Sequence, residues 1–331
     1  MEYTIENDNS TSKTLYIIGN GFDLAHGIKS SYDDYKLFYS TYNVNSCVSS
    51  YRIRPKEREY TENIEKGLDP ELFFGNLSGD WSNIEEAIGK YDVEDIKEYI
   101  EPEDDKEEDF TKQDELKSSR LQFFFNNTIN ALRILFKKWV DNIDIRVKAK
   151  HEQYKFNKDG LFLSFNYTEV LETLYGIPMN NICYIHGRRG VDKEYIFGHN
   201  NELPAITIPE EQNYIGYVDI KKGVIDTMNE FVKPYDKCLK TLNHYIKSAK
   251  IEKVIVHGHS LGSVDMVYFE KIVAIIGSDI PWQIDYYHED EIDKIYNLKN
   301  NLGLATVYVR WVSRTCFNPD YLRRKSLEEV Y

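Results

Sequence analysis

Two side chains with catalytic chemistry stand directly after two apolar runs of strand type. Asn166 follows the run 161–165, and His186 follows the run 182–185. The residues between the runs have a helical pattern, with Thr168 as a candidate N-cap. Strand, helix and strand form a βαβ unit of a parallel sheet, and ligands bind beyond the carboxyl ends of such strands. The spacing therefore predicts an amide and an imidazole at one edge of a sheet, with the imidazole as a candidate general base.

A glycine turn follows the first predicted strand. The apolar run 14–18 leads directly into Gly19-Asn20-Gly21. Dinucleotide-binding folds use a strand that enters a Gly-x-Gly turn to bring backbone N–H groups against a pyrophosphate. Leu24 occupies the position of the third glycine in the usual fingerprint, so a tight strand-to-helix turn without a ligand is the competing interpretation.

A serine in a third polar loop suggests a different reaction. The segment 258–262 reads G-x-S-x-G, follows the predicted strand 251–256 and precedes a helical pattern, as a nucleophile elbow does. On this alternative the protein is an α/β-hydrolase-type serine esterase, with Ser260 as nucleophile and Asp285 and His288 as partners. We rank it second, because only about two strands follow the serine and its two partners lie too close together for separate loops.

Each of these polar residues also has an ordinary structural interpretation. Asn166 could cap a helix, and His186 could be a hydrogen-bonded histidine at a strand end. Several histidines lie elsewhere in the chain, but none has the ligand spacing of a zinc site, and we expect no metal. Because all the polar groups follow predicted strands, we favour one shared pocket at the sheet edge.

Periodicity supplies the elements that position these residues. Strands are predicted over 14–18, 161–165, 182–185, 251–256, 280–287 and 306–312, and helices over 32–39, 81–86, 116–141, 234–249, 266–276 and 289–297. The pattern is that of an α/β, Rossmann-like doubly wound parallel sheet with two large helical insertions. The predicted parts are a disordered tail (1–12), a core (13–44, 156–204 and 251–312), two insertions (45–155 and 205–250) and a C-terminal tail (313–331).

Composition narrows the classes of partner. The chain has 331 residues, with 55 acidic against 41 basic side chains and a formal net charge of -14, which makes nucleic acid and anionic membranes unlikely partners. No apolar run has transmembrane length and the polar start lacks a signal-peptide core, so we predict a cytoplasmic protein. The four cysteines are far apart in sequence, which predicts reduced thiols.

Several motifs together resemble a known family. They are Ile17 to Gly27, the Trp81 and Glu85 pair, Ser164 to Thr168, Ile185 to Gly187, Phe197 to Asn200, and Gly258 to Asp265. In the same order, over roughly residues 14–276, they resemble the bacteriophage abortive infection AbiH family. The resemblance implies bacterial antiviral defence and a phage protein as trigger.

A more remote resemblance concerns the order of four motifs. The four motifs are a GxG turn, an Asn-Tyr pair, a His-Gly pair and Gly-x-Ser-Leu-x-x-x-Asp. The order of these motifs is similar to that in SIR2-like proteins, which have a Rossmann-like fold and bind NAD. Many of them hydrolyse NAD in defence systems. The resemblance implies an NAD glycohydrolase-like enzyme with Asn166 and His186 as catalytic residues and NAD as substrate or ligand. Thr168 stands where that family often has Asp.

The NAD hypothesis assigns further residues. The N–H groups of Gly19, Asn20 and Gly21 would contact the pyrophosphate, and Ser260 and Asp265 would bind the adenosine end. Phe22, Asp23 and His26 would close over the nicotinamide side. Trp81 and Glu85 would line the pocket from the helical insertion, unless Trp81 belongs to the core, which we favour. A non-catalytic nucleotide- or phage-sensing module is the other alternative, in which the acidic surface and the insertions dock a protein partner or a second copy.

Overall fold

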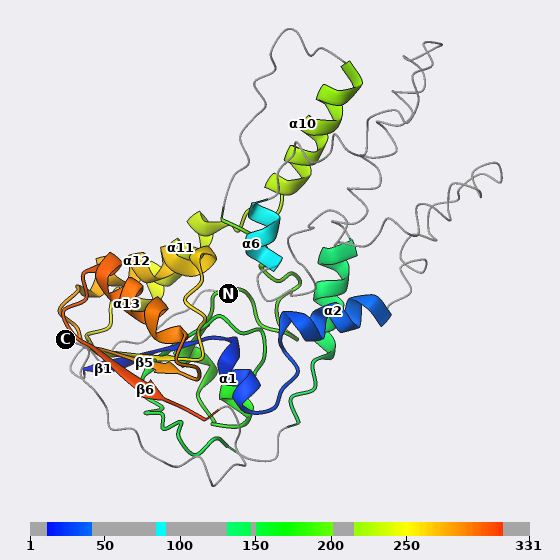
Figure 1. Ribbon diagram of the computed structural model, residues 1–331. Helices are drawn as coiled ribbons and strands as arrows, with labels where there is room; N and C mark the ends of the chain where they lie inside the picture. The colour runs from blue at the N-terminus through cyan, green and yellow to red at the C-terminus, as the bar shows by residue number, and fades with distance from the viewer. Residues whose placement is uncertain (1–11, 42–83, 91–130, 147–149, 201–214, 314–331) are drawn as a thin grey trace, which may run out of the picture. The chain divides into compact units, whose positions relative to one another are not determined.

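The computed structural model describes residues 12–41, 84–90, 131–146, 150–200 and 215–313 (Figure 1). The chain divides into two compact units. The first comprises 1–31, 139–196 and 234–331, and the second comprises 32–138 and 197–233. The predicted disordered N-terminal tail, the acidic run at 101–109, Trp81 and most of the C-terminal tail lie outside the described residues.

The first unit is built on a six-stranded sheet in which every neighbouring pair is parallel. Its strands are β1 (Lys13–Ile18), β2 (Leu161–Ser164), β3 (Ile182–Tyr184), β4 (Ile251–His257), β5 (Trp282–Tyr286) and β6 (Val307–Trp311). The strand order β3-β2-β1-β4-β5-β6 reverses direction between β1 and β4, as in Rossmann-like sheets. The predicted α/β Rossmann-like fold is therefore confirmed, and each strand lies within or close to its predicted run.

Three helices cover one face of this sheet. They are α11 (Tyr235–Ile246), α12 (Met266–Ile276) and α13 (Glu291–Leu302), which lie together beside the strands in Figure 1. Right-handed crossovers that run in one direction along a sheet place their helices on the same face. The buried side chains of α11 pack on the strands, so this helix, which the sequence pattern groups with the second insertion, belongs to the sheet-bearing unit.

The opposite face of β1 and β2 carries an aromatic layer. Tyr16 stacks on Phe162 with ring centroids 4.7 Å apart, and Phe156 packs edge-on against both rings. Phe22 joins this layer from α1 (Asn20–Ala25), with its ring 5.9 Å from that of Phe156. The remaining short elements of this unit are α9 (Val170–Thr173) and the 3-10 turns η5 (Met179–Asn181) and η7 (Ser263–Asp265).

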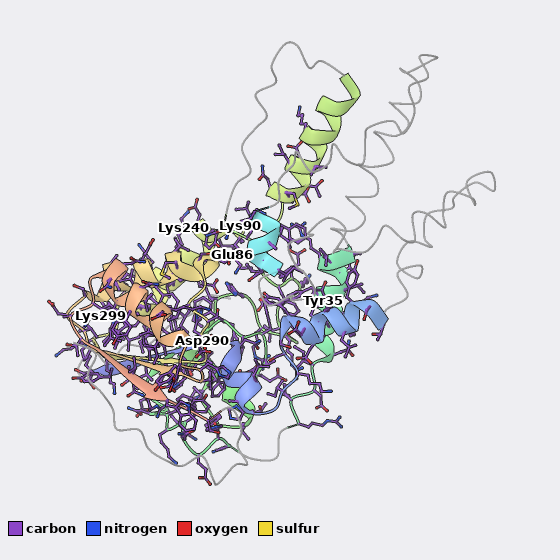
Figure 2. All side chains as sticks on the ribbon, viewed as in Figure 1. Tyr35, Glu86, Lys90, Lys240, Asp290 and Lys299 are labelled. Carbon is purple, nitrogen blue, oxygen red and sulfur yellow. The ribbon has the colours of Figure 1, made fainter. Side chains whose placement is uncertain are left out.

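The second unit contains α2 (Tyr32–Thr41), α6 (Ile84–Gly89), α10 (Ile215–Asn229) and residues 131–138 of a further helical segment. The buried Tyr35 of α2, labelled in Figure 2, donates its hydroxyl to the carbonyl of Leu132 at 2.6 Å. Phe136 stacks on Phe197 with centroids 4.3 Å apart. The helix predicted over 116–141 is confirmed where it is described, and its residues 116–130 lie outside the described part.

A buried ion pair joins segments of this second unit. The side chain of Lys233 is fully buried, and its Nζ lies 3.3 Å from the carboxylate of Glu85 on α6. The same carboxylate accepts the N–H of Gly198 at 2.9 Å. Glu85 is therefore a structural residue of this unit.

We expect Glu85→Ala to destabilise the second unit by about 2–3 kcal/mol, because it removes a charged acceptor from a buried ammonium and a backbone N–H. Glu86→Ala is the matched control on the same helix. Glu86 forms an exposed pair with Lys90 at 2.5 Å, labelled in Figure 2, and such pairs contribute about 0.3–0.5 kcal/mol. Urea denaturation of both variants measures the difference, and equal losses would contradict the structural role of Glu85.

Candidate functional site

The carboxyl ends of β2, β3 and β4 meet around one phenylalanine. Phe165 follows β2, and its ring lies edge-on to the ring of His186, which comes after β3, with centroids 5.3 Å apart. The ring of His259, which comes after β4, is edge-on to the same phenylalanine at 4.5 Å. The two imidazoles thus lie on the same side of the sheet edge, held by one aromatic side chain.

A carboxylate lies between these two imidazoles. Asp265, at the end of η7, has one oxygen 3.7 Å from Nε2 of His186 and the other 3.6 Å from Nε2 of His259. These separations are longer than a hydrogen bond but short enough for strong electrostatic attraction in a buried setting. The side chains of His186 and His259 are 5% and 3% exposed, and that of Asp265 is 17% exposed. The carboxylate is therefore placed to stabilise positive charge on either ring.

His259 was not among the site residues predicted from the sequence, and Asp265 was expected at the adenosine end of the ligand. The G-H-S motif could have identified His259 as a site residue, because it places an imidazole directly after a glycine at the end of a predicted strand. Among the described residues, no group of three or more His, Cys, Asp or Glu side chains has an arrangement that could hold a metal ion.

Asn166 is fixed by a carboxyl group from α1. Its Nδ2 donates to Oδ1 of Asp23 at 2.8 Å, and the hydroxyl of Thr168 donates to Oδ2 at 2.5 Å. Burial raises the pKa of Asp23 to about 7, although both hydrogen bonds and the charge of Arg189 oppose the rise. The prediction of Thr168 as a helix N-cap is wrong: its hydroxyl is bonded to Asp23, and Glu169 precedes α9 without a side-chain cap bond.

The glycine turn packs against the end of β4. The N–H of Gly19 donates to the carbonyl of His257 at 2.9 Å, and that of Gly21 donates to the carbonyl of Gly258 at 2.7 Å. A Cβ on Gly19 would lie 2.5 Å from the Cα of His259, so the close approach of two backbones requires a glycine there. These two amides, expected to contact a pyrophosphate, are bonded to protein carbonyls in this structure.

The other residues expected around the ligand lie at varied depths. Asn20 is bonded to Ser30 twice. Its Nδ2 donates to the Ser30 carbonyl at 2.8 Å, and its Oδ1 accepts from the Ser30 hydroxyl at 2.6 Å. Phe22, Asp23 and His26, expected to close over a nicotinamide, are only 0%, 1% and 8% exposed. Each of these three side chains packs inside the unit.

His26 has a structural environment. Its Nδ1–H donates to the carbonyl of Phe22 at 2.7 Å, so its Nε2 accepts from the hydroxyl of Tyr175 at 2.7 Å. That hydroxyl also accepts the N–H of His151 at 3.0 Å. Burial lowers the pKa of His26 to about 4. The ring is therefore neutral near neutral pH. Its Nδ1 bonds within α1, and its Nε2 holds the segment around residue 151 against α1 through the Tyr175 hydroxyl.

Ser260 lies in an exposed position of the loop after β4. In a nucleophile elbow the serine itself takes up the strained turn conformation. Here the positive φ values of the loop belong to Gly258 at 64° and Leu261 at 55°. Asp285 bonds to Nδ1 of His257 at 2.6 Å, although the esterase alternative pairs it with His288. The geometry gives the esterase alternative no support.

Asp285 is the centre of a second polar cluster that sequence reasoning missed. It accepts two hydrogen bonds from Arg310, at 2.8 and 2.5 Å, besides the one from His257. The strand register places Arg310 directly opposite Asp285 on β6. An aspartate and an arginine at matching positions of two successive strands are the signal that could have revealed this pair.

Comparison with known proteins identifies the family. The family model described as "Bacteriophage abortive infection AbiH" matches residues 15–286. The chain belongs to the AbiH family. No curated protein and no solved structure gives a significant match.

Membership of the AbiH family confirms the resemblance seen in the motifs and supports an anti-phage abortive-infection role. The matched region includes all six polar side chains of the candidate site: Asp23, Asn166, Thr168, His186, His259 and Asp265. Among the described residues of this AbiH protein, no helix is both long enough and apolar enough to cross a bilayer.

Proposed function

We propose that this AbiH protein binds NAD or a related nucleotide at the carboxyl ends of β1 to β4 and hydrolyses its N-glycosidic bond. The observation that carries the proposal is the reversal of strand order between β1 and β4, because Asn166, His186 and Asp265 follow β2, β3 and β4 at the edge where such sheets bind ligands. The remote resemblance to SIR2-like proteins supports the same ligand.

The chemistry follows from the polar groups of the site. Cleavage of the bond between ribose and nicotinamide passes through an oxocarbenium-like state and needs one oriented water molecule. In the proposed reaction His186 takes a proton from that water as its oxygen bonds to the ribose carbon, and nicotinamide leaves with the bonding electrons. Asp265 stabilises the imidazolium that forms. The products are nicotinamide and ADP-ribose.

Contacts to the rest of the ligand are assigned by exposure. Ser260 is exposed at the same edge and is the proposed contact to the adenosine end. Asp265 is assigned to the two imidazoles rather than to a ribose, because both of its oxygens lie toward them. Gly19 and Gly21 shape the turn, since their amides are bonded to β4.

Release of nicotinamide from NAD tests the proposal. We expect turnover by the wild-type protein, and a decrease of at least about a hundredfold in kcat for His186→Ala and Asn166→Ala, because one removes the general base and the other a positioned polar group. Ser260→Ala tests the esterase alternative, which requires this variant to abolish hydrolysis of an ester substrate. Equal background rates for the wild type and both site variants would exclude hydrolysis of NAD at this site.

A nucleotide sensor without turnover is the second candidate. It is favoured by the internal bonding of the Gly19 and Gly21 amides and by the low exposure of His186. Thermal-shift measurements with NAD, ADP-ribose and other nucleotides separate the two candidates. Stabilisation by a nucleotide without release of nicotinamide would identify a sensor.

A further inference from the structure

The two ends of the Asn166 amide have different surroundings. Its Nδ2 is bonded to Asp23, whereas its Oδ1 is buried and has no hydrogen-bond partner among the described residues. The whole residue is only 5% exposed. A buried acceptor without a partner costs about 1–3 kcal/mol. Such an atom in a native structure needs an explanation, and a water molecule, an ion or a ligand that supplies the missing donor is the usual one.

Asp23 decides which end of the amide is left open. Above about pH 7 the carboxylate of Asp23 is ionised and can only accept hydrogen bonds, so the amide must turn its N–H₂ group toward Asp23 and its oxygen away. Thr168 bonds to the second carboxylate oxygen, which stops the carboxylate from rotating. The three side chains come from α1 and from the loop after β2, so their arrangement exists only in the folded sheet.

We propose that Asp23 and Thr168 are positioning residues that orient Asn166 so that its Oδ1 accepts a hydrogen bond from a hydroxyl group of the ligand or from the attacking water. This inference rests on the proposed function and specifies its chemistry. A sugar hydroxyl or water can donate to Oδ1, but a phosphate oxygen without a proton cannot. Asp23 therefore acts through Asn166, and it does not close over the nicotinamide as the sequence suggested.

The loss of folding stability that comes from burying the carboxyl group of Asp23 supports this role. Its pKa in the folded protein, about 7, is higher than its ordinary value. The folded state therefore holds the proton more tightly than the unfolded state, and stability falls as pH rises from about 4 to 7. Among the charged groups that act on it, Arg189 opposes this rise and Glu169 adds to it. An asparagine at position 23 would avoid the cost, so stability alone does not explain the aspartate.

Asp23→Asn is the first test. We expect kcat for nicotinamide release to fall at least about tenfold with KM within about threefold, since orientation of the amide matters for the reacting state. At about pH 8 we expect the variant to be no less stable than the wild type, because a buried charge is removed. A clear loss of stability, or unchanged kcat, would overturn the positioning role.

Thr168 provides a graded comparison. Thr168→Val removes the hydroxyl and should reduce kcat about tenfold, whereas Thr168→Ser keeps it and should restore most of the rate. Thr173→Val is the control in the same segment, because the Thr173 hydroxyl donates to the carbonyl of Glu169 within an exposed turn. Equal rates for Val and Ser at position 168 would contradict the proposal.

A second measurement does not depend on turnover. In the full-length protein with isotope-labelled asparagine, the Asn166 side-chain N–H₂ signal is identified by its loss in Asn166→Asp. We expect one strongly hydrogen-bonded proton that shifts with pH near 7 as Asp23 titrates, and loss of this pH-dependent shift in Asp23→Asn, whose side chain does not titrate. The same pH dependence of the signal in both proteins would exclude the orienting bond. Failure of the wild type to release nicotinamide would count against the proposed function alone.

The choice of ligand distinguishes a hydroxyl from a phosphate. ADP-ribose carries sugar hydroxyls, and inorganic pyrophosphate carries none. We expect ADP-ribose to perturb the Asn166 signal and pyrophosphate to leave it unchanged. Perturbation by pyrophosphate alone would overturn the assignment of Oδ1 to a hydroxyl donor.

Discussion

The Gly258→Ala variant is expected to lose at least about 4 kcal/mol of the free energy of unfolding. Gly258 has a φ of 64°, and a Cβ there would lie 2.2 Å from the backbone nitrogen of Phe22 and 2.5 Å from the carbonyl carbon of Gly21. Backbone atoms cannot rotate away as a flexible side chain can. Relief would require α1 to move off β4 and break the bond from Gly21 N–H to the Gly258 carbonyl.

Gly262→Ala is the matched control for this prediction. It lies in the same loop with a φ of -68°, and the nearest atom to its Cβ would be the Ser260 hydroxyl at 3.6 Å. We expect its stability to stay within about 1 kcal/mol of the wild type. Urea denaturation followed by circular dichroism measures both variants. Similar stabilities for the two would show that α1 does not pack against β4 as described.

The Asp285→Ala variant is expected to be destabilised by about 3–5 kcal/mol at neutral pH. The side chain of Asp285 is fully buried and is bonded to His257 and, by two hydrogen bonds, to Arg310. Its removal leaves a largely buried guanidinium and a buried imidazole without their shared acceptor. Asp279→Ala, at an exposed position, is the control, and we expect it to change stability by less than about 0.5 kcal/mol.

The pH dependence of this loss provides a second check. Burial alone would raise the pKa of Asp285, but its pairing with His257 and Arg310 outweighs burial and holds the pKa below the ordinary value. A lowered pKa in the folded state gives stability that is present above about pH 4 and lost as pH falls through the folded value. The difference between wild type and Asp285→Ala should therefore shrink in acid. A difference that stays constant down to about pH 2 would contradict the pairing.

The local pattern of residues was sufficient to predict the elements of the sheet. The apolar run at 161–165 and the largely β-branched segment at 251–256 are long enough for strands and too short for helices, and each is followed by glycine or polar residues. The helix predicted over 266–276 has the observed bounds of α12. Because parallel strands end at one edge, the same patterns placed Asn166 and His186 on that edge.

Local patterns do not determine which polar side chains meet. Asp23 and Asn166 are 143 residues apart, and their bond depends on β1 and β2 being neighbours in the sheet. The glycine turn shows the same ambiguity, because a glycine is needed both where a phosphate approaches the backbone and where another backbone does.

The sequence by itself determined the strands, their parallel arrangement and the edge of the sheet that carries the polar groups. Strand order and register, which arise from packing of the whole sheet, decided that β4 meets the turn, that Asp23 orients Asn166 and that Asp265 lies between two histidines.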